Sequence, residues 1–218
     1  MSSIHTASRI EPSANGTAPH PASVPSSVQS QPWVNGNVPN YCDYTVLLNR
    51  MVDTAPPNSW LVEVGIYHGF SLRHLAHRAK AARNNLTVVG VDWGRGSPEH
   101  ADQMAALPCG NLAGPMLSTL ITGGVADDVM LVLAPSVKAA KLVPDGSCHM
   151  VFIDGDHSRA GVLADIEAWL PKIKPGSYIC GHDWPTFPGV HGAVCDVFGH
   201  KNHMVLDCPS CWAVQIGK

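Results

Sequence analysis

Short apolar runs that alternate with a helical pattern constrain the fold of this chain more than any other feature of its sequence. Trp60–Val64 has the length and apolar character of a buried strand. After it, Leu72, Leu75, Ala76 and Ala79 follow the i, i+3, i+4, i+7 spacing of an amphipathic helix. The runs expected to form strands are Trp60–Val64, Thr87–Val91, Met130–Leu133, His149–Ile153 and Tyr178–Cys180, with a terminal pair near Met204–Leu206 and Trp212–Ile216. Strands separated by helices predict an α/β fold with a parallel sheet and helices on both faces.

Three local signals refine this pattern. A helix is expected at Tyr41–Val52, ahead of the first strand, and Ser158 is a suitable N-cap for a later one. The core face of that later helix would be Val162, Leu163, Ile166, Trp169 and Leu170. Pro175-Gly176 is expected to form a turn into the fifth strand.

The N-terminal region differs in composition from the rest. Residues 1–40 are rich in Ser, Pro, Ala, Thr and Asn and carry almost no large apolar side chains. Such a segment buries too little apolar surface to offset the entropy of ordering, so we expect a disordered tail at 1–40 and a folded domain at 41–218.

Charge and cysteine content exclude several classes of protein. The chain has 14 Lys and Arg against 17 Asp and Glu, and no basic cluster stands out, so no nucleic-acid partner is expected. No apolar run approaches the ~20 residues that span a bilayer, and the N-terminus has no secretory signal pattern, so no membrane association is expected. Seven scattered cysteines are typical of reduced thiols, and we expect a cytoplasmic protein that acts on a small molecule.

Polar residues cluster directly after the predicted strands. They are Glu63 to Gly69 after the first, Asp92 after the second, Asp154-Gly-Asp-His157 after the fourth and His182-Asp183 after the fifth. In parallel sheets, ligands bind at the carboxyl ends of the strands, so these clusters are expected to form one site.

The first two clusters favour a nucleoside ligand. Gly65 and Gly69 are spaced G-x-x-x-G, which differs from the G-x-G-x-x-G of dinucleotide-binding folds. Asp92 could accept hydrogen bonds from ribose hydroxyls, although a tight turn and a helix cap would use the same residues.

These motifs resemble a known family. Glu63-x-Gly65-x-x-x-Gly69 followed by Asp92 resembles the first two motifs of class I S-adenosylmethionine-dependent methyltransferases. The run Phe152–Ser158, continuing through Asp165–Leu170 and Lys174–Gly176 to Gly181–Asp183, is similar to O-methyltransferases of sugar and macrolide hydroxyls and of cephalosporin precursors. The similarity covers about Tyr41 to Lys218. It implies a Rossmann-like, seven-stranded, mostly parallel sheet whose last strand is antiparallel. It also implies in-line methyl transfer to a hydroxylated small molecule, and an enzyme that could form a homo-oligomer.

The resemblance also assigns cofactor-binding roles. Glu63 would anchor the ammonium group of S-adenosylmethionine, and Asp92 would hold the ribose beside an adenine that stacks on Trp93. The remaining residues implied to line the cofactor are Gly65, Tyr67, Gly69, Ser136, Val137 and Asp154. Ala134-Pro135 replaces the Gly-Asp that the family often has before its serine.

The resemblance further implies a divalent cation, Mg²⁺ or Mn²⁺, bound by Asp154, His182 and Asp183. His182 stands where relatives have an acid, which suits Mn²⁺ or a softer ion better than Mg²⁺. The alternative is that no metal binds. Asp156 and His157 are the two candidates for the catalytic base that removes the hydroxyl proton.

Other interpretations remain open from the sequence. The segment Gly94–Gly114 is expected to form part of the acceptor wall. A structural zinc site could instead use the C-terminal cluster Cys195, His200, His203, Cys208 and Cys211. The chain could also be a catalytically idle relative that binds cofactor or a partner, or a nucleotide-binding oxidoreductase.

Overall fold

One mixed sheet organises the part of the chain that the structure, a computed structural model, describes. The described residues are 43–217, so the tail predicted at 1–40 lies outside them. Seven strands follow the order β3-β2-β1-β4-β5-β7-β6. The strands are β1 Trp60–Val64, β2 Thr87–Asp92, β3 Val129–Leu133, β4 Cys148–Ile153, β5 Ile173–Gly181, β6 Met204–Val205 and β7 Cys208–Gln215. The first five pair in parallel, and β7 is antiparallel to both β5 and β6, which confirms the predicted fold class.

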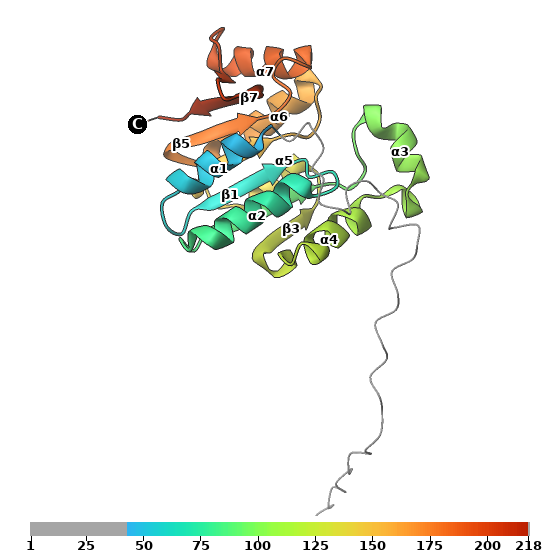
Figure 1. Ribbon diagram of the computed structural model, residues 1–218. Helices are drawn as coiled ribbons and strands as arrows, with labels where there is room; N and C mark the ends of the chain where they lie inside the picture. The colour runs from blue at the N-terminus through green and yellow to red at the C-terminus, as the bar shows by residue number, and fades with distance from the viewer. Residues whose placement is uncertain (1–42, 218) are drawn as a thin grey trace, which may run out of the picture. The chain divides into compact units, whose positions relative to one another are not determined.

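Helices cover both faces of this sheet (Figure 1). Those on one face are α1 Thr45–Thr54, α2 Phe70–Ala82, the short α3 Ala101–Ala106 and α4 Ala113–Thr122. Those on the other face are α5 Ser136–Ala139, α6 Arg159–Trp169 and α7 Pro188–Phe198. Single-turn 3₁₀ helices occur at η1 Pro98–His100, η2 Pro108–Gly110, η3 Ala126–Asp128, η4 Ala140–Leu142 and η5 Leu170–Lys172. None of the described helices has the length and apolar character needed to cross a membrane.

The two faces carry separate hydrophobic cores because side chains alternate along each strand. Leu61 of β1 packs with α1 and α2, whereas its neighbour Val62 packs with α6 and α7. Trp169 and Trp212 are the largest buried side chains of the second core, and the indole Nε1–H of Trp169 donates to Ser136 Oγ at 2.7 Å. This alternation fixes the register of the strands, and therefore aligns their carboxyl ends along one edge of the sheet.

One prediction of local structure needs correction. Pro175-Gly176 does not precede the fifth strand but lies inside β5, where the pairing with β4 shifts register between Cys148 and Met150. Gly176 has φ +83, so it supplies the left-handed backbone of this irregularity. The segment Gly94–Gly114, predicted to form part of the acceptor wall, contains α3 and the start of α4.

Candidate functional site

The turn after β1 is pressed against the loop after β4. Gly65 has φ +85, and a Cβ at this position would lie 2.2 Å from the carbonyl oxygen of Asp154 and 2.6 Å from Cα of Gly155. The amide of Asp154 donates to the carbonyl of Val64 at 2.7 Å, which ties the same two loops together. Gly69 also has a positive φ, +83, and forms the N-cap of α2. The close approach that requires Gly65 is therefore between two backbone segments of the site.

Replacing Gly65 by alanine is expected to destabilise the protein by at least about 3 kcal/mol, because backbone strain adds to overlap with a backbone that has no room to move. Gly176→Ala is the matched control, since Gly176 has a similar φ of +83 but no atom within 4 Å of an added Cβ. It should cost only the strain, about 1–2 kcal/mol. Thermal unfolding of both variants measures the difference, and equal losses would contradict the close-approach explanation.

Asp92 holds the same turn from the side of β2. Its Oδ2 accepts hydrogen bonds from the amides of Ile66 and Tyr67 at 2.8 and 3.0 Å, and its Oδ1 accepts one from the amide of Gly94 at 2.7 Å. These bonds orient the carboxylate at the carboxyl end of β2, and its predicted contact with a ribose would use the remaining lone pairs. Trp93, next along the chain, is 52% exposed, as an adenine-stacking side chain must be before it binds.

Glu63 is a fully buried acid at the carboxyl end of β1. Ser71 of α2 donates a hydrogen bond to its Oε1, while its Oε2 has no hydrogen-bond partner among the described residues. Burial, aided by the nearby charges of Asp154 and Asp92, raises the pKa of Glu63 to about 8 although the Ser71 bond opposes the shift. A buried carboxyl group with one oxygen lacking a hydrogen-bond partner destabilises the folded protein unless a ligand donates a hydrogen bond to that oxygen.

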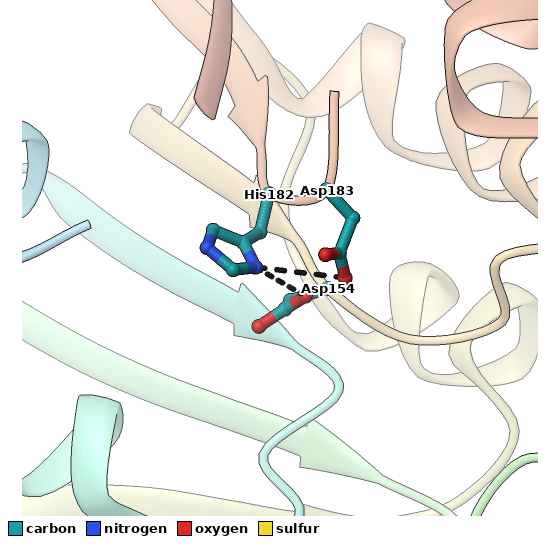
Figure 2. A group of neighbouring side chains, drawn as sticks. All are labelled: Asp154, His182 and Asp183. Atoms are coloured by element: carbon teal, nitrogen blue, oxygen red, sulfur yellow. Dashed lines mark ion pairs between the residues drawn. The ribbon is translucent and has the colours of Figure 1, made fainter. Parts of the chain in front are cut away.

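Asp154, His182 and Asp183 converge at the ends of β4 and β5 (Figure 2). His182 Nδ1 lies 3.7 Å from Asp154 Oδ1 and 3.5 Å from Asp183 Oδ2. One ligand atom from each of the three residues lies within 4.8 Å of the others, the arrangement of a metal-binding group. Asp183 adopts φ +60, a conformation that is strained for a non-glycine residue and recurs at functional sites. The three residues predicted as metal ligands are thus brought together.

Each charge in this triad is balanced by its neighbours. Burial alone would lower the pKa of His182, but Asp183, Asp154 and Asp43 raise it to about 9. Burial alone would raise the pKa of Asp183, yet hydrogen bonds and charges of His157 and His182 hold it well below its usual range. The carboxylate of Asp183 is therefore ionised at neutral pH, as a cation ligand must be.

The two candidate bases have different surroundings. His157 Nε2 forms an ion pair with Asp183 Oδ2 at 3.0 Å, and its Nδ1 lies 2.7 Å from Glu99 Oε1. Burial opposes protonation of His157, but the carboxylates of Asp154, Asp183 and Glu99 raise its pKa to about 10. Asp156 is exposed, and its Oδ1 accepts a hydrogen bond from the amide of Ser158 at 2.8 Å, at the start of α6. His157 therefore adjoins the triad, whereas Asp156 is hydrogen-bonded to the backbone just before α6, whose N-cap is Ser158.

Sequence reasoning missed two acids that complete the site. Asp43 lies 3.3 Å from His182 Nε2 and accepts a hydrogen bond from Ser210 of β7, so it joins the start of the domain to its last strand. Glu99 comes from the predicted acceptor wall and reaches His157 across the site. No motif marks either residue, because both pairings depend on how distant loops meet.

The acceptor wall also contacts the turn after β1. The Tyr67 ring stacks on His100 with centroids 4.6 Å apart and an interplanar angle of 29°, and its hydroxyl donates to Gln103 of α3. Residues 98–106 therefore border the turn predicted to hold the cofactor.

Ser136 and Val137 begin α5, just beyond the carboxyl end of β3. The bond that Ser136 accepts from Trp169 engages its hydroxyl in core packing. Ala134 donates from its amide to the carbonyl of Asp92 at 2.9 Å, which links this segment to the end of β2. The contact of Ser136 and Val137 with adenine stays a prediction.

The alternative zinc site is wrong. Cys208 and Cys211 of β7 are buried in the core beneath α1 and α2, whereas Cys195 of α7 is buried in the core on the opposite face. Within residues 43–217, the one group of three or more possible ligands is Asp154, His182 and Asp183. The six described cysteines are free thiols.

Comparisons with known proteins agree with this geometry. A family model described as a methyltransferase domain matches residues 62–184. No curated protein matches the chain. Among solved structures, the O-methyltransferase NovP is similar with a TM-score of 0.64, at 17% identity over 81% of this chain and 80% of NovP. The calicheamicin methyltransferase CalS11 gives 0.59, at 17% identity over 88% of this chain and 90% of its own. Cofactor-bound Rv0187 from MTB gives 0.56, at 17% identity over 88% and 87%. At these identities the structural likeness shows the fold.

Proposed function

Because the chain belongs to the methyltransferase domain family, we propose that it transfers the methyl group of S-adenosylmethionine to a hydroxyl oxygen of a small molecule, assisted by a divalent cation. Family membership disfavours the oxidoreductase alternative, in line with the G-x-x-x-G spacing of Gly65 and Gly69. The similar protein CalS11 is a TDP-rhamnose 3'-O-methyltransferase, which supports a hydroxylated acceptor of that kind.

The unpartnered Oε2 of Glu63 is the observation that carries this proposal. It is a buried carboxylate oxygen at the carboxyl end of β1, directly before the glycine turn. The α-ammonium group of a bound ligand would donate a hydrogen bond to this oxygen and would also balance the negative charge of the carboxylate. The residues present therefore fit the amino-acid end of S-adenosylmethionine.

The remaining cofactor contacts follow the strand ends. Gly65 and Gly69 keep side chains out of the turn, Asp92 accepts from the ribose hydroxyls, and Trp93 offers an exposed ring to the adenine. S-adenosylmethionine supplies a methyl group already activated by its sulfonium charge. The main task of the protein is then orientation of acceptor and donor, which contributes roughly 7–11 kcal/mol in well-aligned reactions.

Asp154, His182 and Asp183 are the residues that would hold the divalent cation. Two carboxylates and one imidazole fit Mn²⁺ or Fe²⁺ better than Mg²⁺, which prefers oxygen ligands throughout. A divalent cation there supplies Lewis acidity that lowers the pKa of an acceptor hydroxyl.

His157, rather than Asp156, is the residue that receives the hydroxyl proton in this proposal. Its Nε2 points among the acids of the triad, while Oδ1 of Asp156 accepts a hydrogen bond from the amide of Ser158. These acids keep the free imidazole protonated, with a pKa of about 10, so His157 would act as a base once a divalent cation held by Asp154 and Asp183 offsets their negative charge and lowers that pKa. The net charge of −3 and the absence of a nucleic-acid motif favour a small acceptor over a polyanion. The free thiols of the described cysteines favour the cytoplasm as its location.

A thermal-shift experiment on the full chain tests the proposal. S-adenosylmethionine and S-adenosylhomocysteine at about 100 times their dissociation constants should each stabilise the protein by about 2.7 kcal/mol, a shift of several degrees, whereas NAD should not. Mn²⁺ alone should add stability in the wild type and not in Asp154→Asn, whose neutral side chain is a weaker ligand. No response to either adenosyl ligand would contradict the proposed function. A response to them without any Mn²⁺ effect would remove only the cation.

A further inference from the structure

Strand β3 leaves one edge of the sheet open. It pairs with β2 on one side, and no strand within residues 43–217 pairs with its other side (Figure 1). Its sequence, Val129–Leu133, contains no charged residue and no proline, and its pairing with β2 has no bulge. Natural edge strands normally carry such features to prevent unwanted pairing. This edge is therefore built to be paired.

Exposed apolar side chains gather on the elements at this edge. Met130 and Leu133 of β3 are each 52% exposed, and because side chains alternate along a strand they flank this edge on opposite faces of the sheet, Leu133 on the face covered by α4. Leu117 and Ile121 of α4, the helix that precedes β3, lie one turn apart and are 47% and 59% exposed. We call these four residues the β3 edge patch. They are four of the ten large hydrophobic side chains that are exposed in the described part of the chain. Concentrations of this kind mark interaction surfaces in soluble proteins.

Charges of opposite sign flank the two ends of β3. Asp127 is exposed just before the strand, and Lys138 and Lys141 are exposed just after it. None of these three has an ion-pair partner among residues 43–217, whereas Asp128 is paired with Lys80 at 2.7 Å. When two copies of β3 lie antiparallel, the start of one meets the end of the other, so Asp127 of each copy faces the lysines of its mate.

We propose that a second copy of this chain binds here, with β3 pairing antiparallel to β3 across a two-fold axis. The arrangement uses the same surface on both copies, joins the two sheets, and covers the β3 edge patch. It also closes on itself, because each copy has one such edge and the pairing leaves no β3 free. Charge complementarity selects this occupant, since the surface is complementary to itself only in the antiparallel direction.

The oligomeric state of the full chain tests the proposal. Wild-type protein should sediment as a dimer at about 50 µM, because obligate pairing depends on protomer concentration. Met130→Lys places a like charge from each copy inside the interface and should weaken the dimer by at least about 100-fold. Leu206→Lys is the matched control, since Leu206 is 85% exposed outside the patch, and it should remain dimeric.

A charge exchange gives an independent measurement that does not depend on the apolar patch. Asp127→Lys and Lys138→Asp should each weaken the dimer by about tenfold, and the double variant should recover most of the loss. A monomeric wild type at about 50 µM overturns the proposal, and protection of the β3 amides from hydrogen exchange in that monomer would assign the edge to residues 1–42 instead. Unchanged dimers of Met130→Lys would equally overturn it.

Discussion

Glu63→Gln is expected to weaken the binding of S-adenosylmethionine by about 10- to 100-fold. Glutamine keeps the shape of the side chain and an oxygen that accepts from Ser71, so the local packing is preserved. It replaces the unpartnered carboxylate oxygen by an amide, which cannot pair with an ammonium group. Isothermal titration calorimetry with S-adenosylhomocysteine, which has the same amino-acid end, measures the change.

The same residue predicts a proton release on binding. The pKa of Glu63 is raised to about 8, so this acid is largely protonated at pH 7 in the free protein. A bound ammonium favours the carboxylate and lowers that pKa, so binding near pH 7 should release close to one proton, and affinity should rise as pH increases toward 8. Calorimetry in two buffers with different ionisation enthalpies detects the proton, and Glu63→Gln should abolish it.

Glu167→Gln is the matched control for both measurements. Glu167 lies exposed on α6, so the same change of charge occurs outside the site. It should leave affinity and proton release unchanged. Equal affinity of wild type and Glu63→Gln would show that the ammonium is held elsewhere.

The positions of the strands along the chain were predictable because their sequences carry one dominant signal. Strands β1, β2 and β4 are buried on both faces, so each reads as an uninterrupted apolar run, and their predicted bounds differ from the structure by at most one residue. Ser158 could also be predicted as an N-cap, because capping depends on a local hydrogen bond, here from the amide of Gly161 to the hydroxyl of Ser158.

The helices α4 and α7 were not predicted because glycine and proline interrupt their patterns. Helix α4 has the sequence AGPMLSTLIT and α7 has PGVHGAVCDVF. Proline is compatible with the first turn of a helix, and tertiary contacts of Met116 and Val190 with the two cores outweigh the poor local propensity. Such contacts are invisible in a single sequence.

The residues of the site likewise fall into those that the sequence could place and those that it could not. Asp154, His182 and Asp183 could be placed together because each follows a parallel strand whose end lies at one edge of the sheet. Glu99 and Asp43 could not, since Glu99 lies 58 residues from His157 and Asp43 lies 139 residues from His182. Their positions depend on loops and on the start of α1, for which the sequence offers no spacing rule.

His157→Asn is expected to slow methyl transfer by about 10²- to 10⁴-fold, the usual contribution of a catalytic base, while cofactor affinity changes by less than about threefold. The reason is geometric: His157 contacts the acids of the triad, whereas the unpartnered oxygen of Glu63 and the glycine turn, which bind the cofactor in our proposal, belong to the end of β1. The assay follows S-adenosylhomocysteine formed with a hydroxylated acceptor identified by screening.

Asp156→Asn separates this role from that of the neighbouring acid. Asparagine still accepts a hydrogen bond from the amide of Ser158, so the start of α6 is preserved while the carboxylate is lost. Turnover should then stay within about threefold of the wild type, because a side chain that only holds the backbone ahead of α6 contributes no proton transfer. A loss in Asp156→Asn as large as that in His157→Asn would transfer the base to Asp156. Loss of cofactor binding in His157→Asn would instead mean that His157, through its ion pairs with Asp183 and Glu99, maintains the shape of the site rather than accepting the proton.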